Sequence, residues 1–312
     1  MKIVFMGTPQ AAVPTLQRII SDGHEVVAVY TQPDRPSGRG NRVTSSPVKL
    51  YALEQGIPVH QPVKIRTDEA IDHFRSLGAD MAVVVAYGRI LPEPFLDAFP
   101  KGAVNVHFSL LPKYRGAAPV NWAIVNGESE TGVTTMLMDS GLDTGDILLQ
   151  CSTPIQVGET SIELMDRLSI LGADLLAETL FGIDTIEPRK QADNLASYAP
   201  ILKKEAGIID WSLPADAIAN RVRGFQPFPT AFTYYQALRL TIWAAERVGI
   251  PELGGPGQIV SAKGSDLIVS CGQNSALLIS DLQLEGRRRL ATRDFLNGVS
   301  MREGEVLGSK NE

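Results

Sequence analysis

The sequence has little cysteine and no long hydrophobic run. Cys151 and Cys271 are its only two cysteines, and neither lies near another cysteine or a histidine at metal-ligand spacing, so neither a disulfide framework nor a zinc site is indicated. The longest apolar run, Met81–Tyr87, is far shorter than the roughly 20 residues that a membrane-spanning helix needs. Lys2–Met6 has the pattern of a strand and not of a secretory signal. We therefore expect a cytoplasmic protein with no membrane segment. We also expect a monomer, because no exposed amphipathic repeat indicates a partner.

The common nucleotide-binding motifs are missing too. Gly7-Thr8-Pro9 follows the first strand-like run, but the sequence there has neither G-x-G-x-x-G nor G-x-x-x-x-G-K-[ST]. An NAD-dependent dehydrogenase is therefore disfavoured, and Gly7 is interpreted as permitting a tight turn beside whatever binds at the sheet edge. The net charge of −6 argues against a basic surface over the whole protein.

Two local basic segments remain. Residues 31–50 carry four basic side chains against the single acidic Asp34, and Arg287–Arg289 form a second basic cluster. Either segment could contact phosphates, or could be ordinary solvated surface charge.

A sizeable core is present, since 44% of the 312 residues are hydrophobic and 21% are charged. The first half contains short apolar runs rich in β-branched residues, separated by helix-compatible sequence. These runs are Lys2–Met6, Glu25–Thr31, Met81–Ala86 and Ala103–His107. Near-continuous apolar strands joined by helices predict a mostly parallel sheet covered on both faces.

The pattern changes near residues 185–207, which show no strong periodicity and are interpreted as a linker. A short helix over Ala215–Arg223 is predicted next. Five strand-like stretches follow, at Ala231–Tyr235, Leu238–Ala244, Gln258–Ala262, Leu267–Ser270 and Ala276–Leu284. Short strands separated by glycine-containing turns indicate a small β-barrel or sandwich.

The end of one predicted strand carries two polar residues that are candidates for catalysis. Asn105 and His107 are two residues apart, so they share one face of the strand, at the end where open α/β sheets place their ligands. An amide and an imidazole together can hydrogen-bond a carbonyl oxygen and move a proton. Taken alone, however, such a pair is more often structural than catalytic.

A loop with three aspartates adds to this. Asp139, Asp143 and Asp146 lie among glycines after an apolar strand. A calcium-binding EF-hand is excluded, because Thr144 and Gln150 stand where such a loop, counted from Asp139, needs glycine and glutamate. A plain turn and a carboxylate that orients His107 both remain possible.

Several motifs together resemble the 10-formyltetrahydrofolate-dependent formyltransferases. They are Asn105-Val-His-Phe-Ser-Leu-Leu-Pro112, Tyr114-Arg-Gly-Ala-Ala-Pro119, and the segment from Gly132 to Met138-Asp-Ser-Gly-Leu-Asp-Thr-Gly-Asp146. Gln32-Pro-Asp-Arg-Pro-Ser-Gly-Arg-Gly40 is similar to the inserted loop of the tRNA-dependent members. Tyr198-Ala, Lys203-Lys-Glu-Ala and Ile209-Asp-Trp-Ser resemble the linker of those members and the entry to their second domain.

The resemblance implies a role for particular residues. The catalytic positions fall on Asn105, His107 and Asp143, and the folate-binding turn falls on Ser109, Leu110, Leu111 and Pro112. The positions expected to contact tRNA are Arg39 and Arg42. One position departs from the pattern, since Phe108 stands where the family usually has a small residue. No metal is implied.

The resemblance also implies a domain plan. A Rossmann-like catalytic domain is expected over residues 1–188, with a tRNA-contacting loop at about 32–49. A linker over 189–208 and an OB-like, tRNA-binding β-barrel over 209–312 would follow.

The implied reaction moves the formyl group of 10-formyltetrahydrofolate to the α-amino group of methionyl initiator tRNA, for translation initiation. The alternative is a related formyltransferase that acts on a small amine, such as a sugar nucleotide or glycinamide ribonucleotide, or a formyl-folate hydrolase domain. An inert folate- or RNA-binding protein would have no reason to keep all three polar catalytic positions.

Overall fold

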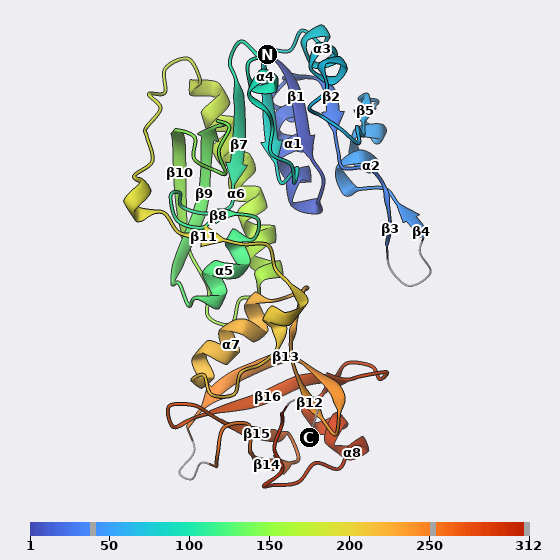
Figure 1. Cartoon of the computed structure of the whole chain (residues 1–312), viewed down its shortest axis with the longest axis vertical. Helices are drawn as coiled ribbons and strands as arrows, with labels where there is room; N and C mark the ends of the chain where they lie inside the picture. Colours follow the sequence, from blue (N-terminus) through green and yellow to red (C-terminus); the bar gives the residue numbers. More distant parts are fainter. Residues whose placement is uncertain (38–41, 250–253, 309–312) are drawn as a thin grey trace. The chain divides into compact units, whose positions relative to one another are not determined.

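The computed structural model describes residues 1–37, 42–249 and 254–308, in two compact units (Figure 1). The first unit comprises Met1–Pro119, Glu130–Pro154 and Leu164–Pro200. The second comprises Val120–Ser129, Ile155–Glu163 and Ile201–Glu312. These units differ from the ranges expected from the sequence, because two segments of the expected catalytic domain belong to the second unit and much of the expected linker belongs to the first. Within the described residues, no helix is long and apolar enough to cross a membrane.

The first unit is built on one sheet. Its strands lie in the order β10 (Ile147–Pro154), β9 (Glu130–Leu137), β7 (Ala103–His107), β6 (Met81–Val85), β1 (Lys2–Gly7), β2 (Glu25–Tyr30) and β5 (Val59–His60). The five strands from β7 to β5 are parallel, and β9 and β10 extend the sheet in antiparallel fashion. The predicted mostly parallel sheet is confirmed. The carboxyl ends of β1, β6 and β7 therefore meet at one edge.

Helices cover this sheet, as its apolar strands require. The helices of the first unit are α1 (Val13–Ser21), α2 (Pro47–Glu54), α3 (Asp68–Ser76), α4 (Glu93–Leu96) and most of the long α6 (Ser161–Gly182). The helix α5 (Pro119–Val125) belongs to the second unit from Val120 onward. Phe74 of α3 and Phe95 of α4 meet edge to face, with ring centroids 4.3 Å apart, in a core with Val4 and Val84 of the sheet. The side chain of Thr67 accepts a hydrogen bond from the Ala70 amide and so caps the start of α3.

Short strand pairs complete the first unit. β3 (Arg35–Ser37) and β4 (Arg42–Thr44) pair antiparallel at the base of the loop expected to contact tRNA. β8 (Arg115–Gly116) pairs in parallel with β11 (Tyr198–Ala199), so part of the expected linker is ordered against the Tyr114-Arg-Gly segment.

The second unit holds an antiparallel sheet. Its strands lie in the order β12 (Ala231–Tyr235), β13 (Leu238–Val248), β16 (Ser275–Leu284), β15 (Asp266–Cys271) and β14 (Ile259–Lys263), with β17 (Leu290–Ala291) also on β16. The helices α7 (Ala215–Gly224) and α8 (Thr292–Gly298) accompany it. Residues 305–308 bridge the two edge strands, because Gly308 pairs with Tyr234 while Val306 pairs with Gln258. The sheet is thereby closed into a barrel, and the predicted second, strand-rich domain is confirmed.

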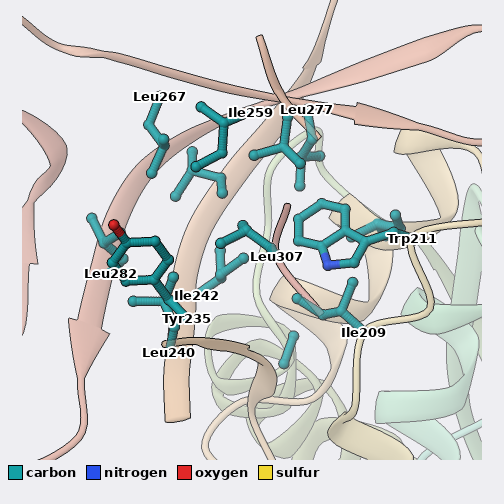
Figure 2. Close-up of a cluster of buried hydrophobic side chains, with 14 of the residues drawn as sticks. Ile209, Trp211, Tyr235, Leu240, Ile242, Ile259, Leu267, Leu277, Leu282 and Leu307 are labelled. Carbon is teal, nitrogen blue, oxygen red and sulfur yellow. The ribbon is translucent and has the colours of Figure 1, made fainter. Parts of the chain in front are cut away.

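A compact cluster of apolar side chains fills this barrel (Figure 2). Leu307 of the closing segment lies among side chains from the barrel strands, including Ile242, and Trp211 lies beside them. The Trp211 indole Nε1–H donates to Thr233 Oγ1 at 3.1 Å, which satisfies the one polar group of that buried ring.

The two segments Val120–Ser129 and Ile155–Glu163 are held to the barrel helix α7 by hydrogen bonds. Asn121 of α5 donates from Nδ2 to the Gly224 carbonyl at 2.7 Å. Arg223 donates to the Glu159 carbonyl at 3.0 Å, and burial lowers the pKa of its guanidinium. These bonds explain why both segments belong to the second unit.

Candidate active site

Strand β7 places Asn105 and His107 at the carboxyl edge of the first unit's sheet. Asn105 pairs with Val84 of β6 on one side, and His107 pairs with Thr134 of β9 on the other. Both side chains are nearly enclosed, with 8% of Asn105 and 6% of His107 exposed. Within the described residues, no hydrogen bond is found for the Asn105 side-chain amide. Its donor and acceptor are thus available to a bound molecule.

The two ring nitrogens of His107 face different oxygen atoms. Nε2 lies 3.0 Å from the Tyr114 carbonyl oxygen, and Nδ1 lies 3.6 Å from Asp143 Oδ2. A carbonyl oxygen only accepts hydrogen bonds, so Nε2 carries a proton. The second nitrogen faces the Asp143 carboxylate. At 3.6 Å this contact is too long for a direct hydrogen bond and is an ion-pair distance. The ring is therefore held between the Tyr114 carbonyl and the Asp143 carboxylate.

The loop between β9 and β10 presents Asp143. Its backbone is in the left-handed region, with φ of +54°, and Oδ2 accepts a hydrogen bond from the Gly116 amide at 2.8 Å. Asp139 stabilises the same loop, because its carboxylate accepts hydrogen bonds from the Gly141 amide and the Thr144 hydroxyl within that loop. Gly116 is itself restricted to glycine, since an added Cβ would lie 2.7 Å from the Ala199 carbonyl oxygen.

The turn after β7 is tied to the sheet through Thr134. The Thr134 hydroxyl donates to the Ser109 carbonyl at 2.7 Å and accepts from the Leu111 amide at 3.1 Å. The Ser109 hydroxyl donates to the Lys113 carbonyl at 2.7 Å, and the Leu111–Pro112 bond is cis. Leu110 and Pro112 are half-buried, so the four residues expected to bind folate form one ordered turn beside His107.

Phe108 lies on the other side of the strand from His107. Its ring is close to Gly172 of α6, where an added Cβ would lie 2.9 Å from Val106 and 3.4 Å from Phe108. Phe108 is buried, with 5% exposed. The absence of a side chain at position 172 lets α6 approach Val106 closely, and the Phe108 ring packs beside it. The departure from the family pattern therefore affects the packing of α6 and leaves the face that carries His107 unchanged.

The sequence interpretation missed the roles of Tyr114 and Gly116. The first fixes the ring of His107 through its carbonyl, and the second fixes Asp143 through its amide. Both contacts are made by backbone atoms, which no side-chain pattern reveals. The positive φ of Tyr114, +61°, and of Gly116, +122°, turns the chain so that these atoms face the site. The glycine in Tyr114-Arg-Gly was the one available signal.

The expected tRNA-contacting residues are only partly described. Arg39 lies outside the described residues, and Arg42 is the first residue of β4. A side-chain network holds the base of this loop. Lys49 Nζ donates to Asp34 Oδ2 at 2.6 Å and to Gln61 Oε1 at 2.7 Å. The hydrogen bonds from Lys49 and from Gln61 hold the pKa of the Asp34 carboxyl below its usual range.

The basic cluster at Arg287–Arg289 is partly engaged within the barrel. Arg289 forms an ion pair with Asp281 at 2.6 Å, and its guanidinium lies 5.0 Å from the centroid of the Trp243 ring. Arg287 donates to the Gly298 carbonyl at 3.3 Å. Among the described residues, no group of three or more histidines, cysteines or acidic residues could hold a metal ion.

Comparison with known proteins identifies related sequences over the whole chain. A family model described as formyl transferase matches residues 1–180, and one described as formyl transferase, C-terminal domain, matches residues 201–300. A protein of Citrifermentans bemidjiense named methionyl-tRNA formyltransferase is 52% identical over 100% of this chain and 98% of its own length. A protein of the same name from Geotalea uraniireducens is 50% identical over 100% and 99%.

A solved structure is similar in fold. The sugar 3N-formyl transferase WlaRD, crystallised with dTDP and 5-N-formyl-THF, has a TM-score of 0.67 and 21% identity. The alignment covers 92% of this chain and 99% of that one.

Proposed function

The chain belongs to the formyl transferase family, and we propose that Asn105, His107 and Asp143 are the residues with which it catalyses formyl transfer. The acceptor is methionyl-tRNA, the substrate for which both full-length relatives are named. The proposed donor is 10-formyltetrahydrofolate, and the proposed acceptor form is the initiator tRNA. We place the reaction in the cytoplasm and expect a monomer. The observation that carries the proposal is the buried cluster in which His107 faces Asp143 beside an unpartnered Asn105 amide.

The donor supplies an activated formyl carbon when it is bound. The ordered turn from Ser109 to Pro112 fits the role of its binding segment, because the turn adjoins His107 and its backbone is fixed by Thr134. The acceptor amine has an intrinsic pKa of roughly 8, lowered further by the adjacent ester, so much of it is unprotonated near neutral pH. Attack by this amine places negative charge on the formyl oxygen.

Asn105, His107 and Asp143 together can stabilise the negative charge on the formyl oxygen. Asn105 would donate a hydrogen bond to the developing oxyanion, and protonated His107 would add positive charge beside it. Asp143 stabilises the imidazolium and, with the Tyr114 carbonyl, fixes the orientation of the ring. The proton released by the amine must reach the leaving nitrogen of the donor, and water relayed by these groups can carry it.

For tRNA binding, we propose the loop that contains Arg39 and Arg42 and the barrel of the second unit. The network of Asp34, Lys49 and Gln61 supports the first part of this proposal, since it gives the loop a rigid base. Phosphate contacts position a nucleic acid without reading its sequence. Selection of the initiator should therefore depend on the shape of the acceptor stem or on an unpaired end.

A formyltransferase for a small amine has less support. The sugar-modifying structure shares 21% identity with this chain and supports the fold alone, whereas the relatives at 50% and 52% identity are named for methionyl-tRNA.

The proposal is tested by replacing the two groups expected at the reacting atoms. Asn105→Ala and His107→Ala should each lower kcat for methionyl-tRNA by about 10²–10³-fold, the usual cost of losing one preorganised donor. His73→Ala, at an exposed histidine of α3, is the matched control and should keep wild-type kcat. Near-normal turnover in either site variant, with the fold intact by circular dichroism, would refute the assignment.

A further inference from the structure

A glutamine outside the recognised catalytic motifs holds the loop that carries Asp143. The side-chain Nε2 of Gln191 donates to the Asp143 carbonyl and to the Gly145 carbonyl, both at 2.8 Å. One amide group thus fixes the backbone on both sides of Thr144. Gln191 lies in the stretch that the sequence indicates is a linker, and its side chain is half-buried.

The orientation of this amide is set by Arg115. The Arg115 guanidinium donates from Nε at 3.0 Å and from one terminal nitrogen at 2.9 Å to Gln191 Oε1. A guanidinium has no acceptor, so the atom of Gln191 that faces it must be the oxygen, and the amide nitrogen must face the loop. Arg115 is nearly enclosed, with 3% exposed, and its second partner is the exposed carboxylate of Asp193. The arginine therefore acts through the glutamine.

The loop needs support at this point. Asp143 has a left-handed backbone, which costs free energy in a non-glycine residue and persists only where the surroundings fix it. Gly145 packs so closely that an added Cβ would lie 1.7 Å from the Leu137 carbonyl oxygen. The Gly116 amide fixes the carboxylate of Asp143, while Gln191 fixes its backbone.

We infer that Arg115 and Gln191 are positioning residues for formyl transfer, which hold the backbone of residues 143–145 so that the Asp143 carboxylate faces His107 Nδ1. The inference rests on the proposed function, because it assigns these residues a role only through Asp143. The hydrogen bonds and ion pairs of both side chains with oxygen atoms lead to Asp143, Gly145 and Asp193 and to each other, and those of His107 lead to Tyr114 and Asp143.

Gln191→Glu is the sharpest variant. The new carboxylate keeps an acceptor for Arg115, so the link to the arginine survives. Both donors to the loop are lost, and an oxygen then faces the two carbonyl oxygens of Asp143 and Gly145. Gln17→Glu, at an exposed position of α1, adds the same charge and is the matched control.

For Gln191→Glu we expect kcat to fall about tenfold to hundredfold, since small displacements of a catalytic group have costs of this order. KM for tRNA and for the folate donor should stay within about threefold, because no substrate contact is removed. Amide hydrogen exchange should rise within residues 138–146 and stay unchanged in the barrel. Wild-type kcat, or unchanged exchange in this loop, would overturn the inference.

A double-mutant cycle separates positioning from general damage. In the Asp143→Ala background, Gln191→Glu should lower kcat by less than about twofold, because its effect is transmitted through the missing carboxylate. Full additivity of the two losses would overturn the inference. Failure of the proposed function is distinguishable, because Asp143→Ala alone would then keep wild-type kcat, whereas the exchange measurement reports on the loop without any turnover.

Discussion

The contact between His107 and Asp143 leads to the most specific prediction for this site. Asp143→Asn removes one negative charge without changing the size of the side chain. Asp143 Oδ2 makes both contacts, so an asparagine oxygen in its place can still accept the hydrogen bond from the Gly116 amide and face His107 Nδ1. The variant thus keeps the geometry of the site and removes only the negative charge that faces the ring.

The expected loss of kcat follows from the distance between His107 Nδ1 and Asp143 Oδ2. Two unit charges about 4 Å apart interact by about 4 kcal/mol at the effective dielectric constant of about 20 that suits protein sites. The two groups lie 3.6 Å apart, and their side chains are 6% and 15% exposed, so solvent screens them little. If the whole interaction were lost from the transition state, the barrier would rise by about 4 kcal/mol and the rate would fall about 10³-fold. The part of the interaction that is already present in the bound ground state does not affect kcat, so this figure is an upper bound. We therefore expect kcat to fall by about 10²–10³-fold.

The assay is steady-state formylation of methionyl-tRNA with the tRNA and the folate donor varied separately. KM values should change by less than about threefold, because Asp143 is expected to act on His107 and not on substrate binding. Asp174→Asn, at an exposed carboxylate of α6, is the control for the loss of one charge. A folded Asp143→Asn protein with kcat within about fivefold of wild type would refute the electrostatic reasoning.

Three further predictions concern the surroundings of the site. Phe108→Ala should destabilise the protein by about 3–5 kcal/mol in urea unfolding while the folded enzyme keeps wild-type kcat; a stable variant with low kcat would contradict the packing role. Lys49→Met should release the pKa of Asp34 toward its usual range. A depressed carboxylate pKa contributes stability above roughly pH 4, and this contribution is lost at lower pH. The free energy of unfolding of wild type should therefore exceed that of this variant by about 1 kcal/mol or less at pH 7, and by a smaller margin at pH 3. An equal margin at both pH values would contradict the linkage. Arg39→Ala should raise KM for tRNA and leave folate affinity unchanged; unchanged tRNA kinetics would refute the role of its loop.

The sequence was sufficient where local pattern determines structure. The buried runs at Lys2–Met6 and Ala103–His107 became β1 and β7, because β-branched apolar stretches have no other way to bury both faces. The five strands predicted after residue 230 also formed, with ends shifted by a few residues. The shared face of Asn105 and His107 followed from strand alternation alone.

Other features depend on partners far apart in the chain. Residues 305–308 close the barrel through backbone bonds to Tyr234 and Gln258, for which the sequence offers no local sign. Gln191 lies in a stretch without periodicity, and its order comes from side-chain bonds to Arg115 and the Asp143 loop. The choice of Asp143 as the partner of His107 came only from family resemblance, since the residues alone left both a plain turn and an orienting carboxylate possible.

The most direct test of the account is transfer of labelled formyl from 10-formyltetrahydrofolate to methionyl initiator tRNA, measured beside elongator methionyl-tRNA. Rapid formylation of the initiator with little or none of the elongator is the predicted result. Failure to formylate either tRNA, with the folate donor still bound, would contradict the account and move the acceptor to a small amine.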